Sequence, residues 1–135
     1  MGQKLAKWAA RISGIYGLTP LEQTLLLNMA VVARDPEANS QGDGPPCVCW
    51  LSREKIAHNI YGTTDKAHNL DRVVKSLRDK GIIEPDGKRA RKGLTQAYRL
   101  NIDILASTAY ESLVSVYPNE AKELGRIQRR AHAQS

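Results

Sequence analysis

The sequence predicts a mainly α-helical fold with a small β-hairpin and additional helices at the N- and C-terminal ends. Three observations predict it. Apolar residues recur at helical spacing in several segments, a short turn joins two of those segments, and a glycine-bounded basic stretch separates two strand-like runs. With 135 residues, the chain has room for one compact domain plus end helices. We divide it into an N-terminal helix (1–17), a central domain (18–101) and C-terminal helices with a basic tail (102–135).

The first predicted helix covers residues 3–16. Its apolar side chains form one stripe, which consists of Leu5, Trp8, Ile12 and Ile15. Gly14 and Gly17 weaken the helix and end it. The stripe either covers the core of its own chain or pairs with residues 102–116 to build a symmetric dimer.

The second predicted helix starts with a capping signature. Thr19 can cap it, Pro20 suits its first position, and Glu22 completes a capping box. The helix runs to about Arg34, and its apolar side chains are Leu25, Leu26, Met29 and Val32. Residues 35–46, which are rich in Pro, Gly, Asn, Asp and Ser, are predicted to form a surface loop.

A short strand is predicted at residues 47–50, followed by a helix at 53–60 that Ser52 caps. Cys47 and Cys49 stand two positions apart, so both point to the same face of a strand. The chain has no second cysteine pair and no histidine pair at zinc-binding spacing. We therefore predict two reduced cysteines in a cytosolic strand rather than a zinc site.

The longest helix of the central domain is predicted at residues 65–80. The turn Tyr61–Thr64 precedes it, Thr64 caps it, and Gly81 follows it as a C-cap. Its apolar face consists of Leu70, Val73, Val74 and Leu77. The remaining face is polar and carries Lys66, His68, Asn69, Arg72, Lys75 and Ser76.

A β-hairpin is predicted to follow this helix. Residues 82–84 and 94–101 have the composition of its strands, and the tip spans residues 85–93. Four cations stand within five residues of that tip, namely Lys88, Arg89, Arg91 and Lys92. Beyond the hairpin, helical spacing predicts two further helices, over residues 102–116 and about 119–133.

The charge of the chain favours a polyanionic partner. The formal net charge is +6 and the pI is about 9.5, and a small basic domain is attracted above all to nucleic acid. No apolar run approaches 18 residues, so we expect no membrane span, and the N-terminus lacks the apolar core of a signal peptide. No Ser/His/Asp or Cys/His set supports catalysis. We expect a cytoplasmic, nucleoid-associated protein that is not an enzyme and needs no cofactor or metal.

The polar helix face and the basic tip together indicate binding to double-stranded DNA. Asn69 and Arg72 are residue types that pair bidentately with adenine and guanine edges in the major groove. The turn hydroxyls and the backbone amides at the helix start can hold a phosphate, and the tip can reach the backbone or a narrow minor groove. The predicted DNA-binding residues are Thr63, Thr64, Lys66, His68, Asn69, Arg72, Lys75, Lys88, Arg89, Arg91 and Lys92.

The order helix–strand–helix–turn–helix–hairpin is the plan of a winged helix-turn-helix domain. The most characteristic segments are Leu18–Glu22, Cys49–Ser52, Arg53–Ala57, Asn69–Leu77 and Lys80–Ile83. Through them, residues 18–100 resemble the helix-turn-helix domains at the start of phage and plasmid replication proteins, and are similar to the winged helices of MarR-like regulators. The resemblance implies sequence-specific DNA binding in replication initiation, or its control, on a phage, plasmid or other mobile element.

Two alternative functions stay open. A transcriptional repressor or activator of the MarR-like type would use the same surface, whereas a winged-helix protein-interaction module would use the Leu- and Ile-rich end helices. We favour a homodimer, since flanking helices commonly pair winged-helix regulators, and a dimer would bind two half-sites. The replication or transcription machinery is the expected protein partner.

Overall fold

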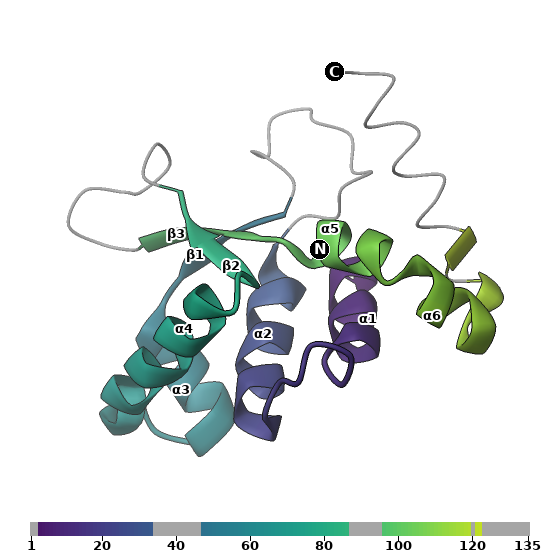
Figure 1. The fold of residues 1–135 in the computed structure, drawn as a ribbon. Helices are drawn as coiled ribbons and strands as arrows, with labels where there is room; N and C mark the ends of the chain where they lie inside the picture. The colour runs from purple at the N-terminus through teal and green to yellow at the C-terminus, as the bar shows by residue number, and fades with distance from the viewer. Residues whose placement is uncertain (1–2, 34–46, 87–95, 120, 123–135) are drawn as a thin grey trace.

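The computed structural model describes residues 3–33, 47–86, 96–119 and 121–122, and it shows a mainly helical protein with a small antiparallel sheet (Figure 1). The α helices α3 and α4 lie at one end of the molecule and α6 at the other, with α2 and α1 between them and α5 packed against α1. In chain order the elements are α1 (Gln3–Ile12), α2 (Pro20–Val32), β1 (Val48–Leu51), α3 (Arg53–Tyr61), the 3-10 helix η1 (Thr64–Asn69), α4 (Leu70–Asp79), β2 (Ile83–Pro85), β3 (Gln96–Leu100), α5 (Ile102–Thr108) and α6 (Tyr110–Val116).

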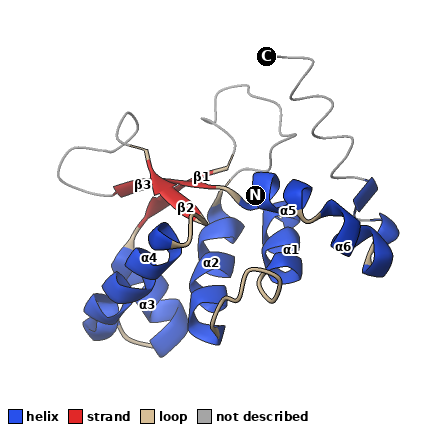
Figure 2. Ribbon diagram, in the orientation of Figure 1, coloured by secondary structure: helices blue, strands red, loops and turns tan. Residues whose placement is uncertain are grey.

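The sheet has the strand order β1-β3-β2, with both pairs antiparallel. Cys49 pairs with Tyr98 and Ile83 pairs with Leu100, and all four side chains are buried in the core. Figure 2 shows the sheet lying over α2 and α4, which β1 and β2 contact. The bounds of the three predicted strands are confirmed to within two residues. In the fold, β1 pairs with β3 and so extends the β2–β3 hairpin to a three-stranded sheet.

The core forms where α2 and α4 meet the sheet and continues between α1, α2 and α5. The apolar face predicted for the longest helix is confirmed on α4, where Leu70 and Leu77 are fully buried and Val73 and Val74 are 7% exposed. Burial of a side chain of this size stabilises the fold by roughly 1.5–3 kcal/mol. The largest side chains below 2% exposure are Leu5, Ile12, Leu25, Leu26, Met29, Leu70, Leu77, Ile82, Ile83, Leu100 and Ile102, with Trp8 at 2%.

The helix predicted at residues 3–16 is shorter than expected. It ends at Ile12, and residues 13–17 form turns that close at Gly17, which has a φ of +68°. The placement of Ile15 on the apolar stripe is therefore wrong, and this side chain is 47% exposed. The other three stripe residues are buried within their own chain, against α2 and α5.

The capping box predicted at the start of α2 is confirmed. Thr19 Oγ1 accepts from the Glu22 backbone N–H at 3.2 Å, and Glu22 Oε1 accepts from the Thr19 N–H at 2.9 Å. The helix ends at Val32 rather than Arg34, since the next residue, Ala33, has extended backbone angles. The inward placement of Val32 is wrong, because the buried face turns toward Ala30 and Ala33 and leaves Val32 66% exposed.

The helix predicted at residues 65–80 is wrong in its N-terminal part. The chain forms η1 first, with Lys66 outside helical angles (φ −97°, ψ 16°), and α4 begins only after it. Thr63 caps η1 in place of Thr64, and its Oγ1 accepts from the backbone N–H two residues on at 3.2 Å. Gly62, with a φ of +77°, ends α3 in the left-handed region, which brings η1 back against α3.

The C-terminal region also differs from its prediction. The single helix expected over residues 102–116 is divided at Ala109 into α5 and α6, and Val116 is 64% exposed rather than part of an apolar stripe. The predicted loop 35–46, most of the hairpin tip and nearly all of the helix 119–133 lie outside the described residues.

The two cysteines are not joined in a disulfide, and both are buried at the sheet. Cys49 lies in β1, whereas Cys47 precedes the strand with a φ of +64°. Burial raises the pKa of the Cys49 thiol to about 12. Within the described part of the chain, no group of three metal-binding side chains occurs.

Candidate nucleic-acid interface

One side of α4 carries positive charge and faces away from the core. Arg72, Lys75 and Arg78 follow one another at intervals of three residues, and all three are exposed. Among the residues that the structure describes, none of the three has an ion-pair partner. We call these three residues the cationic face. Asp71 and Asp79 are also exposed, one near each end of α4, so a carboxylate adjoins the cationic face at both ends.

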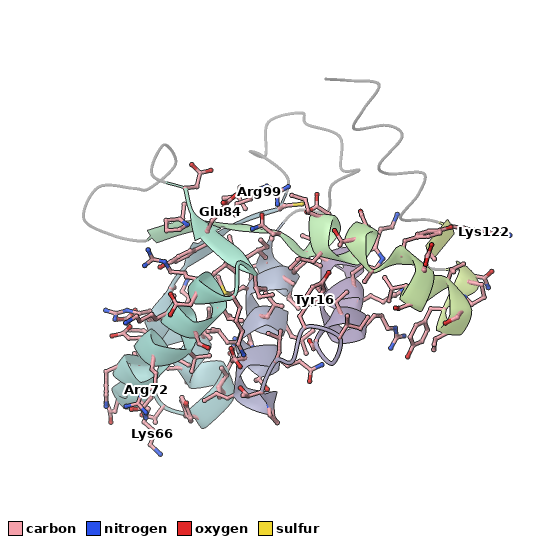
Figure 3. All side chains as sticks on the ribbon, viewed as in Figure 1. Tyr16, Lys66, Arg72, Glu84, Arg99 and Lys122 are labelled. Atoms are coloured by element: carbon pink, nitrogen blue, oxygen red, sulfur yellow. The ribbon has the colours of Figure 1, made fainter. Side chains whose placement is uncertain are left out.

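The structure brings most of the predicted DNA-binding residues to the start of this helix. Lys66 and His68 are exposed on η1, and Asn69 is exposed where η1 meets α4. Figure 3 shows Lys66 and Arg72 at the same end of the molecule. Lys66 Nζ lies 5.7 Å from the centroid of the Tyr61 ring, a distance at which a cation–π contact is weak.

The two turn threonines have different environments. Thr63 is half-buried and its hydroxyl caps η1, whereas Thr64 is exposed at the first position of η1. The Thr63 oxygen is therefore engaged as an acceptor inside the protein. Its hydroxyl hydrogen can still donate outward, since a hydroxyl both accepts and donates.

The cationic face borders two hollows. The first, of about 580 Å³, adjoins the junction of η1 and α4, and its lining comprises Leu21, Tyr61, His68, Asn69, Asp71, Arg72 and Val73. The second, of about 440 Å³, lies between α4 and β2 and is lined by Lys75, Arg78, Asp79, Ile83, Glu84 and Pro85. The exposed side of α4 is thus continuous with the strand that leads into the hairpin tip.

A buried carboxylate fixes the other side of α4 to α2. Glu22 Oε2 accepts from the Ser76 hydroxyl at 2.7 Å, and Glu22 Oε1 accepts from Lys80 Nζ at 2.7 Å. Burial by itself would raise the pKa of Glu22, but the Lys80 ammonium and the hydrogen bonds from Thr19 and Ser76 lower it to about 2. Ser76 and Lys80 therefore face α2, and their anchoring sets which side of α4 meets solvent.

A second ion pair fixes α4 to the start of α3. The Arg53 guanidinium donates to Asp71 Oδ1, and both side chains are about half exposed. The hydrogen bond to Asp71 and the charge of its carboxylate raise the pKa of Arg53. The Asp71 charge is therefore partly offset where it adjoins Arg72.

Two cations of this surface were not among the predicted residues. Arg78 continues the spacing of Lys75 by three residues, so the helical pattern contained the signal for it. Arg53 lies 18 residues before Asp71, and no local pattern indicates that the two side chains meet. The predicted cations of the hairpin tip, Lys88, Arg89, Arg91 and Lys92, lie outside the described residues.

Arg99, on the central strand, does not belong to this surface. Its guanidinium donates to both Asp103 carboxylate oxygens, at 3.2 and 3.3 Å, and to the Asn101 side chain at 2.8 Å. Burial by itself would lower the pKa of Arg99, but Asp103 raises it. The Arg99 guanidinium therefore joins β3 to α5.

Comparisons with protein-family models, with curated proteins and with solved structures found no match for this chain. None of the helices in the described ranges combines the length and the apolar character needed to cross a bilayer.

Proposed function

We propose that this protein is a winged-helix protein that binds double-stranded DNA, with α4 in the major groove. The observation that carries the proposal is the cationic face: three exposed cations without acidic partners, among the described residues, on the outer side of an anchored helix. An α-helix fits the width of the major groove, and its outer side chains are the ones that reach base edges.

The side chains of this surface suit two different roles, contacts with bases and contacts with phosphates. Arg72 can pair with guanine O6 and N7, and Asn69, whose side chain makes no capping bond, can pair with adenine. Lys75 and Arg78 suit phosphate contacts, because they lie farther along α4 beside β2. The hairpin that β2 and β3 begin would serve as the wing, with Lys88, Arg89, Arg91 and Lys92 on the backbone or in the minor groove.

Helices that are already held in place favour specific binding, because little conformational entropy is lost when DNA docks. Glu22 holds α4 to α2 through Ser76 and Lys80, and the Arg53–Asp71 pair holds it to α3. The surface is therefore presented as a fixed pattern of donors and acceptors. That is the property that base readout requires.

The binding experiment begins with selection of duplex DNA from a random library by the full chain, followed by affinity measurement with fluorescence anisotropy. Arg72→Ala should weaken binding to the selected site by roughly 1–3 kcal/mol and relax one base preference. The matched control is Lys122→Ala, which removes one exposed cation at the opposite end of the molecule (Figure 3). Failure of the library to yield a preferred duplex, or equal losses in the two variants, would overturn the proposal.

We further propose that the protein acts in replication initiation, or its control, on a phage, plasmid or other mobile element, with transcriptional regulation as the alternative. Both roles use the same surface, and both fit a nucleoid-associated homodimer on paired half-sites. Genome-wide mapping of the bound sites separates them. Clustered repeats at an origin support replication, whereas a single operator over a promoter supports transcription.

A further inference from the structure

Asp71 is an acidic residue within a surface that otherwise attracts phosphate. It lines the same hollow as Asn69 and Arg72, and its side chain is 54% exposed. A carboxylate at this position repels the phosphate backbone and the acceptor-only base edges. Its presence beside Arg72 therefore lowers the attraction of this surface for DNA unless a donor pairs with the carboxylate.

The ion pair leaves part of this carboxylate open. Arg53 donates to Oδ1, and no donor among the described residues bonds to Oδ2. A carboxylate oxygen accepts hydrogen bonds only, so Oδ2 can be satisfied by an amino group but not by a carbonyl or a ring nitrogen acceptor. In the major groove, cytosine N4 presents such an amino donor, and Asp is a residue type that accepts from it.

Arg53 determines how well the Asp71 carboxylate can accept a hydrogen bond from a base amino group. Its guanidinium comes from the first residue of α3, and it restrains the Asp71 side chain from the flank of α4. Restraint of a reading side chain lowers the entropy lost on binding and sharpens its selectivity. Arg53 also offsets one negative charge, so it weakens the repulsion that Asp71 exerts on phosphates.

We propose that Asp71 is a specificity-determining residue of the DNA-binding surface, which selects an amino group, foremost that of cytosine, and that Arg53 is its positioning residue. This inference rests on the proposed function and goes beyond it, because it assigns an acidic residue to base readout. The same carboxylate lowers affinity for unmatched DNA. Specificity thus arises from one attractive contact and one repulsive one.

The test measures the affinities of the wild-type chain and its variants for the selected duplex, for duplexes with single base changes, and for a random duplex. Asp71→Ala should abolish a cytosine preference of at least about fivefold at one base pair. It should at the same time tighten binding to random DNA, by up to about tenfold at low salt, because a repulsive charge is removed. Glu111→Gln, which removes an exposed negative charge on α6, is the matched control and should change neither quantity.

Arg53→Ala should change the affinity for random DNA in the opposite direction. It should weaken the same base preference as Asp71→Ala, because the carboxylate loses its restraint, but it should reduce affinity for random DNA. Arg53→Lys, which keeps the charge, should restore random-DNA affinity and only part of the base preference, since an ammonium lacks the fixed fork of a guanidinium. Thermal unfolding of each variant checks that the fold is retained.

The outcomes separate this inference from the proposed function. Loss of selected-site affinity in Arg72→Ala, together with unchanged base preference in Asp71→Ala, would overturn the role of Asp71 and leave DNA binding intact. If Asp71→Ala changes the base preference but weakens rather than tightens binding to random DNA, the repulsive role proposed for Asp71 is wrong and the inference is overturned. If the wild-type chain binds no duplex, both proposals fall.

Discussion

Replacement of Glu22 by Gln probes the interaction that sets the orientation of α4. The substitution keeps the size of the side chain but removes its charge. In the folded protein the carboxylate is 5% exposed and accepts from the Thr19 N–H, the Ser76 hydroxyl and Lys80 Nζ. Gln can supply only one acceptor oxygen, so at least one of these donors is left without its partner, and the ion pair with Lys80 is broken.

The magnitude follows from the pKa of Glu22, which falls from 4.5 to about 2 on folding. At about 1.4 kcal/mol per pKa unit, the charged form stabilises the fold by about 3–4 kcal/mol at neutral pH. Lys80 is 35% exposed, and solvent screening reduces this contribution, so we expect Glu22→Gln to lower the free energy of unfolding by about 2–3 kcal/mol at pH 7. A group with a depressed folded-state pKa stabilises above its unfolded pKa. The contribution is therefore lost as pH falls from about 4.5 toward 2.

Urea unfolding followed by far-ultraviolet circular dichroism measures this difference. We expect the gap between the wild-type chain and Glu22→Gln to shrink at pH 3 to less than half of its value at pH 7. The control is Glu111→Gln, an exposed carboxylate on α6, which should stay within about 0.5 kcal/mol of the wild-type chain. A Glu22→Gln variant as stable as this control, or a gap that does not change with pH, would refute the reasoning.

Three further predictions concern the hairpin tip, the core and the thiols. Replacing Lys88, Arg89, Arg91 and Lys92 together by Ala should weaken binding to every duplex and flatten its salt dependence, by roughly 0.9 in logarithmic slope for each phosphate that the tip no longer neutralises; an unchanged slope would exclude a role for the tip. Leu77→Ala should cost about 2–5 kcal/mol in thermal or urea unfolding, because Leu77 is fully buried on α4, whereas Val32→Ala, at an exposed position, should cost less than about 0.5 kcal/mol; equal destabilisation would contradict the assigned core. Cys49, whose pKa burial raises to about 12, should not react with a thiol reagent at pH 8 until the protein unfolds, and rapid labelling of the native protein would show that its burial is wrong.

Much of the local structure followed from local patterns. The capping box at Thr19 and Glu22 and the apolar face at Leu70 and Leu77 depend on residues three to seven positions apart, which is the range over which helical geometry acts. The exposure of Arg72 and Lys75 follows from the same periodicity, since the side of α4 opposite its apolar face must meet solvent.

Other local expectations failed where a second, competing signal was present. Periodicity alone continues the first helix to Ile15, but the turns that close at Gly17 replace its last part and the helix ends at Ile12. The helix predicted over residues 65–80, with Thr64 as its cap, begins instead as η1, because Thr63 is the cap and Lys66 leaves helical angles. These differences lie at element ends, where a hydroxyl hydrogen bond or a single backbone angle outweighs the hydrophobic pattern.

The sequence by itself determined the order of the main helices and strands, and which side chains of α4 are polar and which apolar. Only the tertiary structure decided that β1 pairs with β3, that Glu22 meets Ser76 and Lys80 across more than 50 residues, and that Arg53 holds Asp71. The physical reason is the distance along the chain between the residues that meet. Helical and strand periodicities encode contacts between neighbours in the chain, whereas these partners meet only after hydrophobic burial has packed separate elements together.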